Sequence, residues 1–201
     1  MNFFLNLIYK FIYQSKINFV LRNFNYLIKG LFFNKIKIPP SGLLKLKTDS
    51  GVILMATNQT SYLTQLLFWN GYKQFEYSAI FEDLSKNITS FLDIGANIGY
   101  YSLLAVKSNP KIVAYAFEPA KGPKYYLNKN IILNNFDENI IHENIALSNS
   151  SGEIDFYEVE NVKYRYLEHN LAGEGNAGTK TTSRNFIKNT VKSKTLKMLI
   201  S

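Results

Sequence analysis

The sequence predicts an α/β fold with a parallel, Rossmann-like central sheet. Short apolar segments that end in an acid alternate with segments of helical length, and a glycine-punctuated turn joins the first such strand to its helix. The chain has 201 residues, of which 46% are hydrophobic, so it can bury one core. We therefore expect one α/β domain with an appendage.

The glycine-punctuated turn follows the strand-like segment 91–94. Asp93 precedes Gly95 by two residues, and Gly99 follows with Asn97 between the two glycines. Glycines let backbone N–H groups approach a ligand closely, and the helix N-terminus favours an anionic group. The spacing is not the G-x-G-x-x-G of dinucleotide sites, and no G-x-x-x-x-G-K-[ST] phosphate loop occurs. An acid two residues before the first glycine is instead typical of Rossmann-like proteins that bind S-adenosylmethionine.

A second acid closes the next predicted strand. After a helix at about residues 99–109, the apolar segment 111–117 ends at Glu118, 25 residues after Asp93. An acid at this place, roughly 20–25 residues beyond a glycine loop, can accept both hydroxyls of a ribose. We expect Asp93 to orient the methionine end of the cofactor and Glu118 to hold the ribose. The alternative is that both carboxylates only cap helices or form turns.

The other elements follow from periodicity and from turn residues. Paired prolines at 39–40 stop any preceding helix. We expect a hairpin with strands at 43–47 and 52–56, helices at 61–69, 74–86 and 121–134, a third core strand at 140–147, a further strand at 153–159, and a loop at 170–183.

Three runs carry a resemblance to a known family. They are Asp93-Ile-Gly-Ala-Asn-Ile-Gly-Tyr-Tyr-Ser, Ala116-Phe-Glu-Pro119, and Asn144-Ile-Ala-Leu-Ser-Asn149 with Gly152-Glu-Ile-Asp-Phe156. Over about residues 75–200 the chain resembles the FkbM-type methyltransferases, S-adenosylmethionine-dependent O-methyltransferases that act on sugars and secondary metabolites. The resemblance implies S-adenosyl-L-methionine as cofactor and a small-molecule or glycan acceptor. The cofactor-binding residues expected are Asp93, Gly95, Ala96, Asn97, Gly99, Glu118, Asn144 and Ala146.

One departure from the family pattern concerns the end of the sequence. In the family, a strand of the type D-x-x-K-x-D-x-E-G follows a segment resembling residues 194–197, and this sequence ends at Ser201. We expect a class I methyltransferase sheet truncated after the third core strand and the following hairpin. The glycine-loop strand would then lie at a sheet edge. Three explanations of this truncation stay open: the sequence is a fragment, its reading frame is shifted, or a separate C-terminal chain completes the domain.

The same departure leaves the catalytic residues unknown. No general base can be named, because the acceptor half of this sheet architecture is normally built from the fourth strand onward. We expect no methyl transfer by the chain alone. The alternative function is a non-catalytic module that binds the cofactor and is tethered to a membrane or a partner.

Composition excludes several other classes. The chain has no cysteine, which excludes disulfides, thiolate metal sites and a cysteine nucleophile. Its two histidines lie in unrelated contexts, so we expect no metal site. The formal net charge of +8 is confined to the N-terminal quarter: eight basic residues and no acid precede Asp49, and fifteen bases balance fifteen acids from there on. This asymmetry favours contact of the N-terminal quarter with a membrane surface or a partner protein over nucleic-acid binding. We expect the protein to be cytoplasmic.

The basic segment, residues 1–38, is named here the basic head. Two stretches have helical spacing, each with a broad apolar face and a narrow polar stripe, the second stripe consisting of Asn18, Arg22, Asn25 and Lys29. No run of about 18 apolar residues occurs. Two interpretations stay open: a monotopic anchor on an anionic membrane, or a helical pair that packs on the catalytic domain or closes the cofactor site. The domains expected are the head at 1–38, a connecting hairpin and helices at 39–88, and a partial cofactor-binding domain at 89–201.

Overall fold

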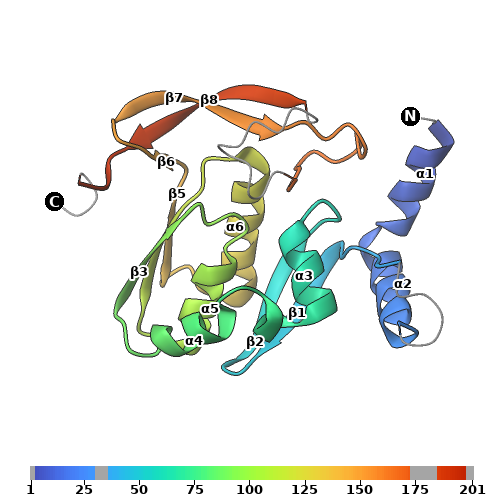
Figure 1. Ribbon diagram of the computed structural model, residues 1–201, viewed down its shortest axis with the longest axis horizontal. Coiled ribbons are helices and arrows are strands. Elements are labelled where there is room, and N and C mark those ends of the chain that lie inside the picture. The colour runs from blue at the N-terminus through green and yellow to red at the C-terminus, as the bar shows by residue number, and fades with distance from the viewer. Residues whose placement is uncertain (1–2, 30–35, 173–184, 198–201) are drawn as a thin grey trace.

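The computed structural model describes residues 3–29, 36–172 and 185–197 (Figure 1). The chain begins with two helices at one end of the molecule. A β-hairpin comes next, then an α/β unit, and finally a second small sheet. The elements in chain order are α1 (Phe3–Ile12), α2 (Ser15–Leu27), β1 (Gly42–Thr48), β2 (Gly51–Thr57), α3 (Tyr62–Asn70), η1 (Tyr72–Gln74), α4 (Ser78–Ser85), β3 (Ser90–Ile94), α5 (Tyr100–Ser108), β4 (Val113–Phe117), α6 (Lys121–Asn134), β5 (Ile140–Glu143), β6 (Ala146–Leu147), β7 (Gly152–Val159) and β8 (Phe186–Lys194).

The central sheet is parallel, as the sequence predicts, and has the order β3-β4-β5. Helices α5 and α6 provide the two crossovers. The residues of α5 at 102–106 are buried because this helix is enclosed between the sheet and its neighbours. On the sheet itself, the register partners Leu92, Tyr115 and Ile141 form a row across the three strands, and all three are exposed. Within the described residues, β3 lies at the edge of its sheet with this apolar row uncovered.

The hairpin β1–β2 is joined to α6 by two asparagine side chains. Asn130 Oδ1 accepts from the Ala56 N–H at 2.6 Å, and Asn134 Oδ1 accepts from the Leu54 N–H at 2.9 Å. The amide groups of the same side chains donate to the carbonyls of Ala56 and Leu54 at 3.3 and 2.7 Å. The two amides therefore pair with the open edge of β2 as a neighbouring strand would, which satisfies backbone groups that an edge leaves free.

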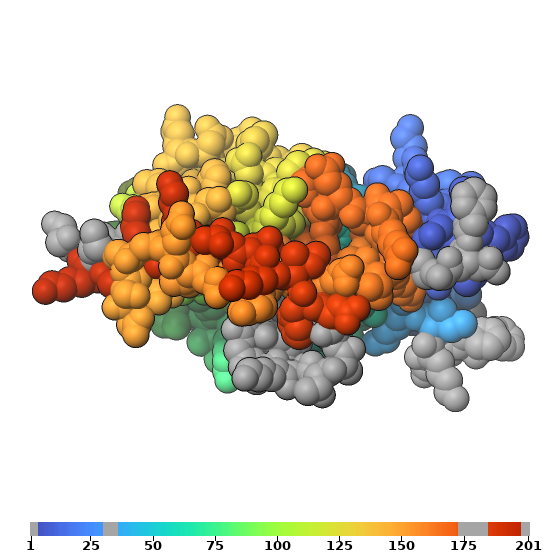
Figure 2. All heavy atoms as spheres, turned by 90° about the horizontal axis from the view of Figure 1, so that it is seen from above, coloured from blue at the N-terminus to red at the C-terminus, as the bar shows by residue number. Residues whose placement is uncertain are grey.

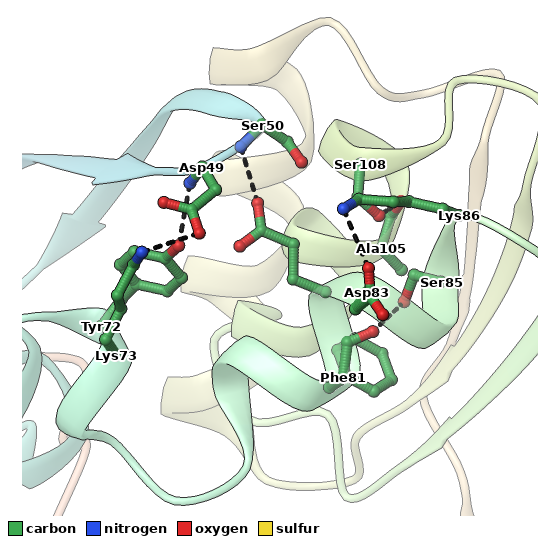
Figure 3. A network of polar contacts seen from close by, with 11 residues as sticks. Asp49, Ser50, Tyr72, Lys73, Phe81, Asp83, Ser85, Lys86, Ala105 and Ser108 are labelled. Atoms are coloured by element: carbon green, nitrogen blue, oxygen red, sulfur yellow. Dashed lines mark hydrogen bonds and ion pairs between the residues drawn. The ribbon is translucent and has the colours of Figure 1, made fainter.

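A polar network holds the hairpin turn against η1 and α4 (Figure 3). The Asp49 N–H donates to the Tyr72 hydroxyl at 2.9 Å, and the Asp49 carboxylate pairs with Lys73 at 2.8 Å. Buried Glu82 accepts from the Ser50 N–H at 2.7 Å. The turn is thus fixed by contacts from two different elements.

Two expected boundaries are wrong. The segment 74–86 is not one helix: η1 ends at Gln74, Glu76 has φ +42°, and α4 begins only at Ser78. A residue in this left-handed region interrupts any right-handed helix. The segment 140–147 is not one strand either, because the chain leaves the central sheet after Glu143 and β6 joins a different sheet.

The second sheet has the order β6-β8-β7. Strand β7 confirms the strand expected at 153–159, but its antiparallel partner is β8, which the sequence analysis did not anticipate. Strand β6 pairs with the same partner in parallel. β8 therefore lies between β6, which was expected to end the third core strand, and β7, which was expected to follow it after the turn at 150–152. Most of the loop expected at 170–183 lies outside the described residues.

Candidate cofactor site

A cavity of about 300 Å³ lies at the carboxyl ends of β3 and β4. Open α/β sheets bind ligands at this edge, and the volume is within the range of small-molecule sites. Residues of β7 and one residue of β8 line the cavity, and these two strands form much of the surface seen in Figure 2 (orange to red). The lining residues are Ile94, Gly95, Asn97, Phe117, Glu118, Pro119, Ala120, Pro123, Ile145, Ala146, Leu147, Phe156, Tyr157, Glu158, Val159, Asn170, Leu171, Ala172 and Phe186.

The glycine-punctuated turn forms one wall of the cavity. Gly95, Asn97 and Gly99 all have left-handed φ values, of +77°, +51° and +86°. The N–H groups of Gly95 and Ala96 both donate to the Phe117 carbonyl, at 2.9 and 3.0 Å, which locks the turn onto the end of β4. Added Cβ atoms would behave differently at the two glycines. At Gly99 a Cβ would lie 2.6 Å from Leu127, whereas at Gly95 nothing lies within 4 Å. Gly99 therefore allows α5 and α6 to pack closely, and Gly95 faces open space.

Glu118 is the buried charged group of the cavity wall. Its Oε2 accepts from the Asn97 N–H at 2.8 Å and its Oε1 from the Ala120 N–H at 2.7 Å. Burial, with a smaller contribution from nearby Glu158, raises the pKa of Glu118 to about 7 despite these two hydrogen bonds. Each carboxylate oxygen has a second lone pair, so two acceptor positions stay available. The side chain is fixed by backbone donors and keeps capacity for a ligand.

The Asp93 side chain contacts helix α5. It is buried, and its Oδ2 accepts from the Ser102 N–H at 3.1 Å and from the Ser102 hydroxyl at 2.6 Å. Burial raises the pKa of Asp93. The side chain contacts α5 and is not among the residues that line the cavity. This geometry corresponds to the capping alternative, and a role of Asp93 toward methionine stays a prediction.

Four of the eight predicted cofactor-binding residues line the cavity, and four do not. Gly95, Asn97, Glu118 and Ala146 line the cavity, whereas Asp93, Ala96, Gly99 and Asn144 do not. Asn144 is exposed beside the end of β5. The Asn97 side chain carries a buried Oδ1 without a hydrogen-bond partner among the described residues. A buried acceptor without a partner is costly, so this oxygen is suited to receive a donor from a ligand.

The sequence analysis missed the cavity wall that β7, β8 and the segment 170–172 supply. The signal for β7 was present: alternation along a strand places Ile154, Phe156 and Glu158 on one face. Phe156 and Glu158 line the cavity, but Tyr157 and Val159 from the other face do so too, so alternation predicts only part of this wall. Nothing comparable marks Asn170–Ala172, because irregular segments have no periodicity. Among the described residues, no group of three or more His, Asp or Glu side chains could hold a metal ion.

A glycine loop and a strand-end acid around a cavity at the carboxyl edge of a parallel sheet are typical of α/β proteins that bind nucleotide-like ligands. The family comparison agrees with this class. The methyltransferase FkbM domain matches residues 93–199, more than half of the chain, and the chain belongs to that family. The resemblance stated from the sequence runs is thereby confirmed. No curated protein sequence matches the chain.

Solved structures show only limited likeness. A protein described as a caffeoyl-CoA O-methyltransferase from Staphylococcus aureus has 19% identity and a TM-score of 0.34, covering 40% of this chain and 41% of its own. A SAM-dependent methyltransferase from Agrobacterium tumefaciens has 12% identity and a TM-score of 0.37, with 57% and 35% covered. A transferase from Pyrococcus horikoshii has 14% identity and a TM-score of 0.39, with 67% and 48% covered. The chain thus spans less than half the length of each, and the assignment depends on the family match.

Proposed function

We propose that this chain binds S-adenosylmethionine in the cavity beside Glu118, in the service of O-methylation of a glycan or secondary-metabolite hydroxyl. The observation that carries the proposal is the Glu118 carboxylate, which is buried at the cavity wall and held by two backbone N–H groups. Family membership supports the methyltransferase class. The oxygen acceptor and its chemical type come from the family resemblance.

Glu118 would hold the ribose. Its two oxygens each have one lone pair beyond those used by Asn97 and Ala120, and adjacent ribose hydroxyls are donors spaced to meet both oxygens. Because the backbone donors already fix the rotamer, little side-chain entropy is lost when the ligand binds. Phe117 and Phe156 of the cavity lining offer apolar surface to the base.

The glycine turn would receive the methionine end. Gly95 faces open space and Asn97 offers its unpartnered Oδ1, so a backbone surface and one acceptor meet the ligand there. The nearby N-terminus of α5 favours a carboxylate. When bound, S-adenosylmethionine supplies a methyl group on a positively charged sulfur. The residues of the glycine turn would position this group, and we assign no residue as the general base.

Ligand selectivity tests the proposal. In calorimetric titrations of the full chain, S-adenosylhomocysteine should bind, and NAD⁺ should bind far more weakly because the turn lacks the dinucleotide spacing. Equal affinity for the two ligands would remove the cofactor assignment. Transfer of a labelled methyl group from S-adenosylmethionine to a hydroxyl acceptor would exclude the non-catalytic alternative.

Affinity for S-adenosylhomocysteine should depend on pH. With a pKa of about 7, Glu118 is mostly protonated at pH 6 and mostly ionised at pH 8. The ionised form is the better acceptor for ribose hydroxyls, so affinity should rise by up to about tenfold between these pH values and then level off. Titrations at constant ionic strength measure this, with Glu118→Gln as the control that loses the dependence. A flat profile for the parent chain would contradict the role of the carboxylate.

A further inference from the structure

Helix α2 is packed with its polar side inward. Asn18, Arg22 and Asn25, which share one helical stripe, are 0%, 2% and 9% exposed. On the opposite side Val20, Phe24 and Leu27 are exposed, and Leu27 reaches 77%, whereas the exposed Phe19 lies beside the stripe with its ring 5.4 Å from the Arg22 guanidinium. An amphipathic helix in a water-soluble domain normally buries the apolar side. The orientation of α2 is the reverse.

Directed hydrogen bonds fix this orientation. Arg22 donates from Nη1 to the Ser41 carbonyl at 2.9 Å and from Nη2 to the Leu43 carbonyl at 2.6 Å. Asn18 Oδ1 accepts from the Ser41 N–H at 2.7 Å, and Asn25 Oδ1 accepts from the Ile38 N–H at 3.1 Å. The polar stripe is thereby joined to the backbone that leads into β1. A rotation that turned the apolar side inward would break all four contacts.

Helix α1 is held by aromatic contacts instead, and Lys10 of its polar stripe is exposed. Tyr9 and Tyr13 pack edge-on against Tyr164, with ring centroids 5.3 and 5.6 Å apart. The remaining sides of the helix carry five large apolar side chains that are exposed: Phe4, Leu5, Leu7, Ile8 and Phe11. The outward apolar side chains of both helices, Phe4, Leu5, Leu7, Ile8, Phe11, Phe19, Val20, Phe24 and Leu27, are called here the apolar face of the head. An apolar surface of this extent marks an interaction site.

The surroundings of this face are positively charged. No acid occurs before Asp49, and Arg22 is the one basic residue of this region that is buried among those described. Lys10, Lys16, Lys29, Lys37, Lys45 and Lys47 are exposed. Apolar side chains flanked by lysines are the pattern of a helix that lies in the interface of an anionic bilayer. A second copy of this chain would bring equal positive charge and would be repelled.

The head also stands apart from the candidate cofactor site. No residue of α1 or α2 lines the cavity. Both helices lie at one end of the molecule, beyond β1 (Figures 1 and 2). No helix among the described residues is both long and apolar enough to cross a bilayer. The geometry therefore gives no support to the interpretation that the head closes the cofactor site.

We propose that the apolar face of the head docks on the surface of an anionic membrane, with α1 and α2 in the plane of the interface and the exposed lysines at the lipid headgroups. Membrane binding then depends on the burial of Arg22, because that burial turns the apolar side chains outward. The inference is independent of the proposed cofactor.

Vesicle flotation of the full chain tests the proposal. Vesicles of phosphatidylcholine with phosphatidylglycerol should carry the chain at low salt and release it as ionic strength rises, whereas phosphatidylcholine alone should retain much less. The double variant Val20→Ser/Phe24→Ser should lose at least about tenfold in vesicle affinity, since both exposed side chains would enter the lipid. The matched control is Ile132→Ser, which alters an exposed apolar side chain on α6 and should bind like the parent.

Three outcomes would overturn the proposal. The parent chain fails to float with anionic vesicles, or the double variant floats as well as the parent, or sedimentation shows a lipid-free dimer that the double variant dissociates. The last outcome would make the face a self-interface. Circular dichroism of each variant separates these results from misfolding, and an unchanged spectrum is expected because the substituted side chains are exposed. A charge reversal, Lys10→Glu/Lys16→Glu, should remove the preference for anionic lipid and leaves the apolar face unchanged.

Discussion

Glu118→Ala is expected to weaken the binding of S-adenosylhomocysteine by about tenfold or more. A hydrogen bond to a charged acceptor contributes ~1.5–3 kcal/mol, and about 1.4 kcal/mol corresponds to a factor of ten. The substitution also removes the acceptor of the Asn97 and Ala120 N–H groups, so the glycine turn loses its connection to the start of α6. Both effects reduce affinity.

Titration calorimetry of parent and variant measures this loss. Glu138→Ala removes an exposed acid on the same domain and should leave affinity unchanged. Glu118→Gln separates the two effects, because its single amide oxygen can still accept one of the two backbone bonds but carries no charge. If Glu118→Ala binds S-adenosylhomocysteine as tightly as the parent does, Glu118 lies outside the ligand contacts.

The parts of the fold that could be predicted from the sequence depend on residues that are close together along the chain. Strands β3 and β4 lie where short apolar runs end in acids, and the turn between β3 and α5 contains the positive φ values that its glycines and Asn97 allow. The position of Glu118 followed from its place at the end of β4. These features depend on neighbouring residues, so a single sequence contains them.

The parts that it missed depend on distant partners. β8 contains Lys188, Asn189, Thr190, Lys192 and Ser193, and its alternation is weak; pairing with β7 makes it a strand. The acceptance by Asp93 of a hydrogen bond from the Ser102 hydroxyl, at 2.6 Å, depends on a side-chain rotamer that the sequence does not specify. Neither the pairing nor the rotamer is encoded by spacing.

The head shows a further limit. Periodicity correctly predicted two amphipathic helices, but periodicity alone does not say which side faces the protein. The general rule favours a buried apolar side, and the opposite is found because Arg22, Asn18 and Asn25 find backbone partners in the segment 38–43. The sequence feature that could have indicated the inward polar side is the single arginine, Arg22, which lies between two asparagines on one helical stripe.

Arg22→Ala is therefore expected to lower the free energy of unfolding by about 2–4 kcal/mol. The change removes hydrogen bonds from a charged donor to Ser41, Leu43 and Asn18, and it leaves the buried Ser41 carbonyl without that partner. The loss is partly offset because the guanidinium is buried without a carboxylate; burial lowers the pKa of Arg22, so relief of that penalty stabilises the variant. For a chain of this size, the unfolding midpoint should fall by roughly 5–15 °C.

Fluorescence of the single tryptophan measures the Arg22 effect directly. Trp69 donates from Nε1 to the Ile38 carbonyl at 3.2 Å and packs 5.7 Å from the Tyr26 ring, so its emission reports whether α2 is docked. Lys45→Ala, which removes an exposed cation from β1, is the matched control and should melt like the parent. Arg22→Ala should shift the Trp69 transition to lower temperature and should also weaken vesicle flotation, because the apolar side is then free to turn inward. If the variant melts and floats as the parent does, Arg22 does not fix the orientation of the head.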